Sequence, residues 1–204
     1  MDAPTAPDPR TGAPVIHRSA RSGLADSVLG TRNLMVVAAL AVVSLIIIIP
    51  LNYLTPAGAS SPRVVMIACS VMGLWVIPYL LPAAVVRRPG AALVASIIIG
   101  VISIFTTPAG PAALVGNVIG GLFIEVPLAL MLYRRWNWRA MLLAAGVFGL
   151  LNSLMYVGLL DAVTGIGVPA GIVATGVCSA VVGGLITLVL ARLLTKAGVG
   201  VDRR

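Results

Sequence analysis

Residues 116–135 read GNVIGGLFIEVPLALMLYRR, an apolar run that holds one carboxylate, Glu125, and ends in two arginines. A helix rises about 1.5 Å per residue, so a span that enters near Leu114 and leaves near Tyr133 would place Glu125 about 17 Å below the outer face, near the middle of a roughly 30 Å hydrocarbon core. Placing a charged side chain at that depth costs roughly 2.5–3.5 kcal/mol even on the lenient scale. Glu125 is therefore expected to face the interior of a helical bundle, and it is the first candidate site residue.

The residues around Glu125 predict a small polar space beside it. Pro127 has no N–H to donate to the carbonyl of Phe123, which leaves a bent turn and a free acceptor near the carboxylate. Three glycines between residues 116 and 121 remove side-chain bulk a turn earlier. Close packing in the outer half of this helix and an opening near Glu125 together outline a buried ligand site.

The composition places the chain in the membrane class. Of its 204 residues, 59% are hydrophobic and 10% charged, with a mean hydropathy of +1.08, which is more apolar surface than a soluble core can hide. The net charge of +8 comes from single and paired basic residues beside apolar runs, without the aromatic interleaving of a nucleic-acid surface. Cys69 and Cys178 both fall in apolar runs, so we expect no disulfide between them.

We expect one all-α integral membrane domain, a bundle of six transmembrane helices over residues 34–194. A disordered cytoplasmic tail (1–33) precedes it and a short basic cytoplasmic tail (195–204) follows it. Pro78 and Pro82 predict a kink in the lower half of the second span. The six apolar runs are residues 34–54, 64–86, 91–105, 114–133, 140–160 and 168–194.

The distribution of basic residues predicts the orientation. With the N-terminus inside, only Arg63 of the 14 Lys and Arg residues lies in an outside loop. Cytoplasmic loops carry the excess of Lys and Arg in membrane proteins, so both termini are expected in the cytoplasm. The pairs Arg87, Arg88 and Arg134, Arg135 are then expected to lie in cytoplasmic turns.

Several polar and aromatic side chains fall at similar depths in different spans. Counted from the outer face at the helical rise, Trp75 and Ser179 lie about 16 Å down, Asn152 about 12 Å and Thr175 about 10 Å. If these helix faces converge, they enclose an aromatic wall, a carboxylate and several hydrogen-bonding groups, as in a small-molecule site. The predicted substrate-binding residues are Glu125, Trp75, Tyr79, Asn152, Tyr156, Thr175 and Ser179.

Each of these residues has a structural alternative. The Asn, Thr and Ser side chains can simply hydrogen-bond one helix to another. Trp75 can be a packing residue, and Glu125 can be a protonated acid bonded to a neighbouring helix. Trp136 and Trp138 are expected to anchor a turn at the headgroup interface, where indoles are enriched.

The charge of the layer favours a cationic or amine-bearing ligand, because no Lys, Arg or His lies at this depth in any predicted span. The ring nitrogen and exocyclic amine of an amidine-like heterocycle could both contact Glu125.

The chain has no pair of span aspartates, no HExxH motif and no Walker A loop. We therefore expect no enzyme activity, no ATP hydrolysis by this chain and no cofactor. One Glu and two separated Cys do not form a metal-carrier cluster.

Three sequence features occur in a fixed order: a basic pair that runs into Pro-Gly (RRPGAA, 87–92), the glycine-rich span with Glu125, and YRRW at 133–136. With these features and six short spans, the chain resembles the substrate-binding S component of an energy-coupling factor (ECF) vitamin transporter. Within that class it is most similar to the YkoE-like branch, which is linked to thiamine and hydroxymethylpyrimidine. The resemblance covers about residues 34–194.

The resemblance implies a multi-pass protein of the bacterial plasma membrane that captures a vitamin from outside. It implies as partners a transmembrane coupling subunit, which usually meets small residues of the first helix, and two cytoplasmic ATPases. Here Ala38, Ala39 and Ala41 supply small residues, without the usual Ala-x-x-x-Ala spacing. Nickel and cobalt members carry a His directly after the initiator Met, whereas this chain begins Met1-Asp2, which disfavours a metal substrate.

Two functions from other classes stay open. A proton-coupled carrier would let Glu125 alternate between a proton and a cationic small molecule, and it would need no ATPase partner. A non-transporting scaffold would present its basic cytoplasmic face to lipid or protein. For a transporter, the turn-rich outer loops 55–63 and 106–111 are predicted to form the lid of the site.

Overall fold

The computed structural model describes residues 29–54, 61–134, 136–165 and 170–199. The predicted tail up to residue 28, most of the first lid loop and residues 200–204 lie outside the described residues. Every regular element in the described part of the chain is a helix, which confirms the all-α class. The first described helix begins at Thr31, within the predicted N-terminal tail, and the last ends at Lys196, within the predicted C-terminal tail. These two helices are therefore two or three residues longer than the predicted bundle.

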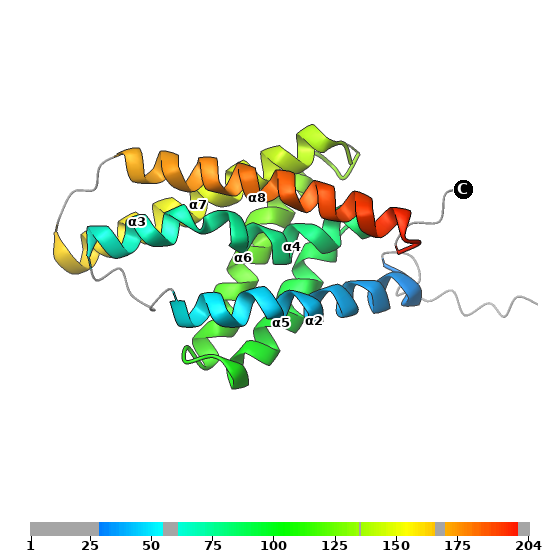
Figure 1. Cartoon of the computed structure of the whole chain (residues 1–204), viewed down its shortest axis with the longest axis horizontal. Coiled ribbons are helices and arrows are strands. Elements are labelled where there is room, and N and C mark those ends of the chain that lie inside the picture. The colour runs from blue at the N-terminus through cyan, green and yellow to red at the C-terminus, as the bar shows by residue number, and fades with distance from the viewer. Residues whose placement is uncertain (1–28, 55–60, 135, 166–169, 200–204) are drawn as a thin grey trace, which may run out of the picture.

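Seven helices follow one another in these residues (Figure 1). The most extensive contacts join α4 to α8, α7 to α8 and α5 to α6, and α2 lies against α4 and α5. The α5–α6 pair crosses the direction of α2 and α8 steeply (Figure 1). The helices are α2 (Thr31–Leu54), α3 (Pro62–Ser70), α4 (Met72–Val86), α5 (Ala91–Thr106), α6 (Pro111–Leu130), α7 (Trp138–Thr164) and α8 (Ala170–Lys196).

The number of helices able to span a membrane differs from the predicted six. Four helices of the described chain, α2, α6, α7 and α8, are long and apolar enough, and the bent pair α3–α4 makes a fifth if it counts as one span. Helix α5 is apolar but has only 16 residues, about 24 Å at the helical rise and less than a roughly 30 Å core. Multi-pass membrane character is confirmed, whereas the six-span count and the side of the termini stay predictions.

The second predicted span is broken at Val71, in its upper half, and the kink expected from the two prolines further down stays a prediction. Helices α3 and α4 meet there at 41°, and Pro78 and Pro82 both lie within α4. The Ser179 hydroxyl of α8 explains the position of the break, because it donates to the Ser70 carbonyl at 2.6 Å and accepts from the Gly73 N–H at 2.9 Å. Both backbone groups freed by the break are thereby satisfied by a side chain of the neighbouring helix.

Helices α4 and α8 cross with their backbones in contact at two glycines. A Cβ on Gly73 would overlap the Ser179 carbonyl, and a Cβ on Gly183 would overlap the Gly73 backbone. Small residues allow this close approach of membrane helices, where dispersion contacts and hydrogen bonds drive association.

One core runs through the bundle, and the outer surface is apolar. Tyr79 of α4 and Phe148 of α7 are both 2% exposed, and their ring centroids are 5.8 Å apart. Outside this core, Phe105 is 85% exposed and Ile46 is 75% exposed. Large apolar side chains on the outside suit a protein surrounded by lipid tails.

Helix α6 ends a turn earlier than the sequence predicts. It stops at Leu130, and the next residues include Leu132 and Tyr133 with φ of 52° and 51°. These left-handed conformations turn the chain away from the helix axis. Because of the early end, Glu125 lies in the last two turns of α6.

Candidate functional site

Glu125 caps the first turn of a neighbouring helix. Its Oε1 accepts a hydrogen bond from the Gly90 N–H at 2.6 Å, and its Oε2 accepts one from the Ala92 N–H at 3.1 Å. Gly90 is the N-cap of α5, with φ of 81°. The first N–H groups of a helix have no partner within the helix, and the positive end of the helix dipole favours an anion. A 6% exposed carboxylate of α6 therefore serves as the cap that α5 lacks.

This geometry corrects the predicted surroundings of Glu125. The sequence placed it at the depth of Trp75 and Ser179, but its hydrogen bonds lead to the turn between α4 and α5. Its hydrogen-bond partners in the described chain, Gly90, Ala92 and Tyr133, include none of the other predicted site residues. Hydrogen bonds to a neighbouring helix are the structural alternative that the sequence leaves open for Glu125, and these two contacts are of that kind.

Tyr133 joins Glu125 to the turn between α6 and α7. Burial and a side-chain hydrogen bond to Glu125 raise the pKa of Tyr133 from 10.0 to about 12. The Tyr133 ring also stacks on Trp136, with centroids 6.0 Å apart and planes at 22°. The RRPG turn, the Glu-bearing helix and the YRRW turn, which the sequence presents as separate features, thus meet around one carboxylate.

A second polar cluster lies deep in the bundle and includes the predicted residue Tyr79. The Tyr79 hydroxyl donates to Asn117 Oδ1 at 2.8 Å, and the Asn117 amide donates to the Ala113 carbonyl at 2.6 Å. Asn117 is 4% exposed, and Gly120 packs on the tyrosine ring, where an added Cβ would approach within 3.0 Å. The sequence analysis missed Asn117. Its signal was present, because Asn117 is the one amide side chain in the glycine-rich segment GNVIGG at 116–121.

Tyr156, Cys69 and Ser153 extend this cluster. Cys69 of α3 donates a long hydrogen bond from Sγ to Ser153 Oγ of α7 at 3.6 Å, and both residues are fully buried. Tyr156 is partly buried against the core and lies near Tyr79 and Cys69. We call Tyr79, Asn117, Cys69, Ser153 and Tyr156 the buried polar cluster.

Within the part of the chain that the structure describes, Asn152, Thr175 and Trp75 do not join this cluster through hydrogen bonds. Asn152 is one residue away from Ser153 but donates to the Phe148 carbonyl of its own helix at 3.2 Å. Thr175 likewise donates to the Gly171 carbonyl of α8 at 2.9 Å. Trp75 is partly buried against the core. Periodicity places residues on a helix face but cannot tell which of two adjacent polar side chains turns inward.

Thr175 and Ser179 instead line an open depression on the surface of α3 and α8. Its lining is Ser70, Ala174, Thr175, Cys178, Ser179 and Val182. Five of the seven predicted residues are thus divided among the Glu125 cap, the buried polar cluster and this outer depression, whereas Asn152 and Trp75 belong to none of them.

The second predicted lid loop is a short turn tied to α2. Tyr53 near the end of α2 donates from its hydroxyl to the Thr106 carbonyl at 3.3 Å, and Thr107 donates to the Ser103 carbonyl at 2.8 Å. Asn117 lies in the second turn of the helix that follows. This end of the molecule therefore brings the turn and the buried polar cluster into one region, and the lid role stays a prediction.

Two comparisons with known proteins agree with this architecture. Residues 32–151 match the family described as "ABC-type cobalt transport system, permease component". A crystal structure described as an S-component of an ECF transporter is similar with a TM-score of 0.69 and 18% identity, over 82% of this chain and 86% of that chain. At that identity the likeness is one of fold. No curated protein matches.

Proposed function

Because this chain belongs to the family of permease components of ABC-type cobalt transport systems and is a multi-pass protein of the bacterial plasma membrane, we propose that it is the substrate-binding S component of an ECF-type importer. The observation that carries the proposal is the shared fold with an ECF S component over 82% of the chain. The chain has no Walker A loop, so a transmembrane coupling subunit and two ATPases would supply the energy of transport.

The buried polar cluster is the best candidate for substrate recognition. It lies on α3, α4, α6 and α7, near the turn at 106–111, and combines a phenol and a carboxamide held by a hydrogen bond of 2.8 Å. A ligand that replaces this bond would find a donor and an acceptor beside the ring of Tyr156. Ligand pockets of this kind are largely apolar with a few placed polar groups.

This cluster fits an uncharged aminopyrimidine better than a cation. The resemblance implies thiamine or hydroxymethylpyrimidine, and both carry an exocyclic amine beside a ring nitrogen that can pair with the Asn117 amide. Among the described residues, no carboxylate joins the cluster, since Glu125 caps α5. We therefore place hydroxymethylpyrimidine ahead of thiamine, whose thiazolium would lack a counter-charge.

Cobalt is the second candidate substrate, on the strength of the family's description. The described residues contain no group of three His, Cys, Asp or Glu able to hold a metal ion. The lone His17 and the Met1-Asp2 start lie outside them. A proton-coupled carrier and a scaffold are the remaining alternatives, and the first would have to free Glu125 from both backbone bonds in each cycle.

Binding by the purified protein tests the proposal. Titration calorimetry with hydroxymethylpyrimidine, thiamine and Co²⁺ should show tightest binding of the pyrimidine, and Asn117→Leu should weaken it by about tenfold or more, because a buried donor and acceptor lose their partner. Asn152→Leu is the matched control and should bind normally.

Proteoliposomes that also hold the coupling subunit and ATPases should take up the ligand only with ATP. ATP-independent uptake would favour the carrier, tight binding of Co²⁺ alone would favour the metal, and no binding at all would favour the scaffold.

A further inference from the structure

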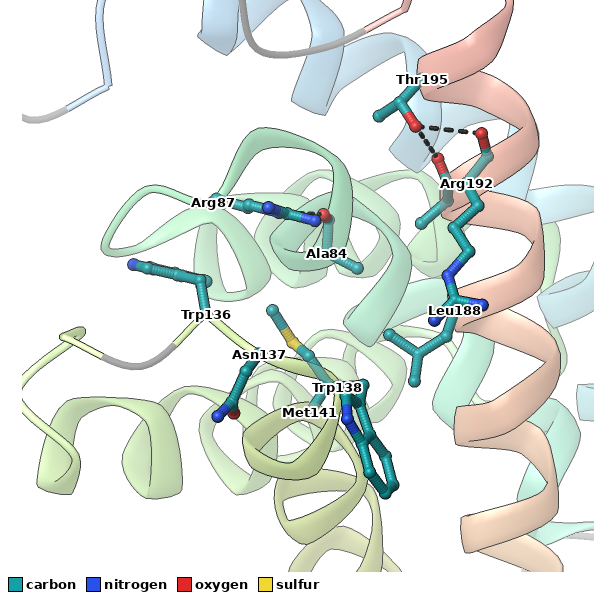
Figure 2. Close-up of a pocket in the computed structure, with 10 residues that line it drawn as sticks. Ala84, Arg87, Trp136, Asn137, Trp138, Met141, Leu188, Arg192 and Thr195 are labelled. Atoms are coloured by element: carbon teal, nitrogen blue, oxygen red, sulfur yellow. Dashed lines mark hydrogen bonds between the residues drawn. The ribbon is translucent and has the colours of Figure 1, made fainter. Parts of the chain in front are cut away.

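A second depression lies among the ends of three helices and has no role in the proposed function (Figure 2). It is bounded by the C-terminal end of α4, the turn before α7 with the first residues of that helix, and the last turns of α8. Its lining residues are Ala84, Arg87, Trp136, Asn137, Trp138, Met141, Leu188, Ala191, Arg192 and Thr195.

Two arginine side chains give this depression a positive charge. Arg87 is the C-cap of α4 in a left-handed conformation, with φ of 52°, and its Nε donates only a long hydrogen bond to the Ala84 carbonyl at 3.4 Å. Arg192 approaches from α8 on the other side (Figure 2). No Asp or Glu lines the depression, and among the described residues neither guanidinium forms an ion pair with a carboxylate. Two guanidiniums without an acid form a site for a phosphate or carboxylate.

The indoles place this charge at the level of lipid headgroups. Trp138 is 52% exposed, with the Arg139 guanidinium 5.3 Å from its ring centroid, and Trp136 lies on the opposite side of the turn. Indoles gather at membrane interfaces because one edge is polar and the body is apolar. A third polar group is available, since Asn137 caps α7 through Oδ1, which accepts from the Ala140 N–H at 2.9 Å, and its amide nitrogen can donate to a ligand.

Apart from the arginines, the indoles, Asn137 and Thr195, the lining is apolar: Ala84, Met141, Leu188 and Ala191. Leu188 lies one turn before Arg192 in α8, so the apolar and the charged parts of the depression adjoin (Figure 2). A free anion needs only the charged rim, whereas a lipid uses both the charged rim and an apolar wall for its acyl chain. Basic pockets between transmembrane helices on the cytoplasmic side are typical sites of anionic headgroups.

We propose that this depression binds the headgroup of an anionic phospholipid, whose phosphodiester contacts Arg87 and Arg192 while an acyl chain lies along Met141 and Leu188. The lipid would join the ends of α4, α7 and α8, which otherwise meet at this end through few polar contacts. It would come from the leaflet that faces the basic turns.

Lipid binding to the purified full chain tests this proposal. Thermal unfolding is followed in detergent with phosphatidylglycerol or phosphatidylcholine added, and bound lipid is counted by native mass spectrometry. Wild type should bind phosphatidylglycerol and unfold at a higher temperature with it than with phosphatidylcholine. The double variant R87Q/R192Q should lose about tenfold or more in phosphatidylglycerol affinity.

The matched control removes the same charge outside the depression. Arg88 and Arg134 are exposed and do not line it, so R88Q/R134Q should bind phosphatidylglycerol as wild type does. Equal losses in both double variants would overturn the site in favour of general surface charge. If the double variant at 87 and 192 is not recovered folded, R192Q alone, on the exposed side of α8, should still lose about threefold or more.

Three further results would overturn the lipid assignment. Competition by inorganic phosphate or glycerol phosphate at the same concentration would indicate a free-anion site. Equal binding of phosphatidylcholine would indicate that the charge is not recognised. Loss of assembly with the coupling subunit, with lipid binding unchanged, would assign the two arginines to a protein partner.

Discussion

Glu125 stands out in the sequence as an acid within an apolar run, and in the fold it caps the start of α5. An acid in an apolar run must find partners, and the run itself does not say which. In the structure the partners are the Gly90 and Ala92 N–H groups at the start of α5. The expected effect of replacing Glu125 therefore moves from ligand affinity to stability.

The first prediction concerns Glu125→Gln. The amide keeps one acceptor but turns an NH₂ donor toward a backbone N–H, so one buried group loses its partner at a cost of about 1–3 kcal/mol. Thermal unfolding should shift to lower temperature while ligand affinity changes little. Asp161→Asn, which removes an exposed acid from α7, is the control and should unfold like wild type. A large loss of affinity with normal stability would return Glu125 to the ligand site.

The second prediction uses the raised pKa of Tyr133, a residue in the turn after α6. Its folded pKa of about 12 lies above its ordinary value of 10.0 because of burial and the bond to Glu125. The neutral phenol therefore stabilises the fold fully below about pH 10, and this contribution disappears as the pH rises from about 10 to about 12. The tyrosinate absorbance difference between wild type and Tyr133→Phe should titrate near pH 12. A midpoint near 10 would show that neither burial nor the bond to Glu125 raises this pKa.

At the scale of elements, the break between α3 and α4 depends on a residue from a distant helix. The bend of 41° at Val71 leaves the Ser70 carbonyl and the Gly73 N–H without helical partners, and the Ser179 hydroxyl bonds to both. Pro78 and Pro82 are tolerated inside α4 because neighbouring helices compensate for the lost bond in membrane bundles.

The third prediction is that Ser179→Ala destabilises this break. Two backbone groups at an apolar helix surface lose their partner, so the free energy of unfolding should fall by about 1–3 kcal/mol. Thr175→Val is the matched control, because the Thr175 hydroxyl bonds only to its own helix at Gly171. Equal stability of the two variants in denaturant titrations would mean that the break holds without Ser179.

The fourth prediction concerns the crossing of α4 and α8. Gly183→Ala places a Cβ against the Gly73 backbone, and overpacking of this kind costs about 1–3 kcal/mol or more when backbone is the obstacle. Gly116→Ala is the control, because nothing lies within 4 Å of its added Cβ, and Ala favours a helix. The yield of monodisperse protein and its unfolding midpoint should drop for the first variant only.

At the scale of the whole molecule, charge distribution predicts which end faces the cytoplasm. The Glu125 cap, both basic turns and the depression of Arg87 and Arg192 lie at one end, and the turn at 106–111 lies at the other. The positive-inside rule assigns the basic end to the cytoplasm. Substrate capture and lipid binding would then occur at opposite faces.

The fifth prediction tests this assignment with single cysteines in a background lacking Cys69 and Cys178. Cysteine in place of Pro108, which is exposed in the outer turn, should react with an impermeant reagent added to intact cells. Cysteine in place of Arg88 should react only after permeabilisation. Reaction at position 88 in intact cells would reverse the orientation and with it the leaflet of the proposed lipid.

The sequence alone predicted the all-α membrane class, the basic turns and the resemblance to an S component, because hydropathy, charge and motif order are properties of local sequence. It also named Tyr79 and Tyr156, which the structure brings into one cluster. Gly90 marked the start of α5, and the arginines at 134 and 135 marked the end of α6 to within about a turn.

Only the tertiary structure decided what the polar residues contact, because rotation and tilt of each helix come from packing against the others. Hydropathy cannot tell that α6 ends at Leu130, which brings Glu125 to the first turn of α5, or that Ser153 and not Asn152 turns inward. It also cannot tell that Ser179 of α8 completes the break between α3 and α4. Arg87 and Arg192 are 105 residues apart in the chain, and only the packing of α4 beside α8 places both guanidiniums around one depression.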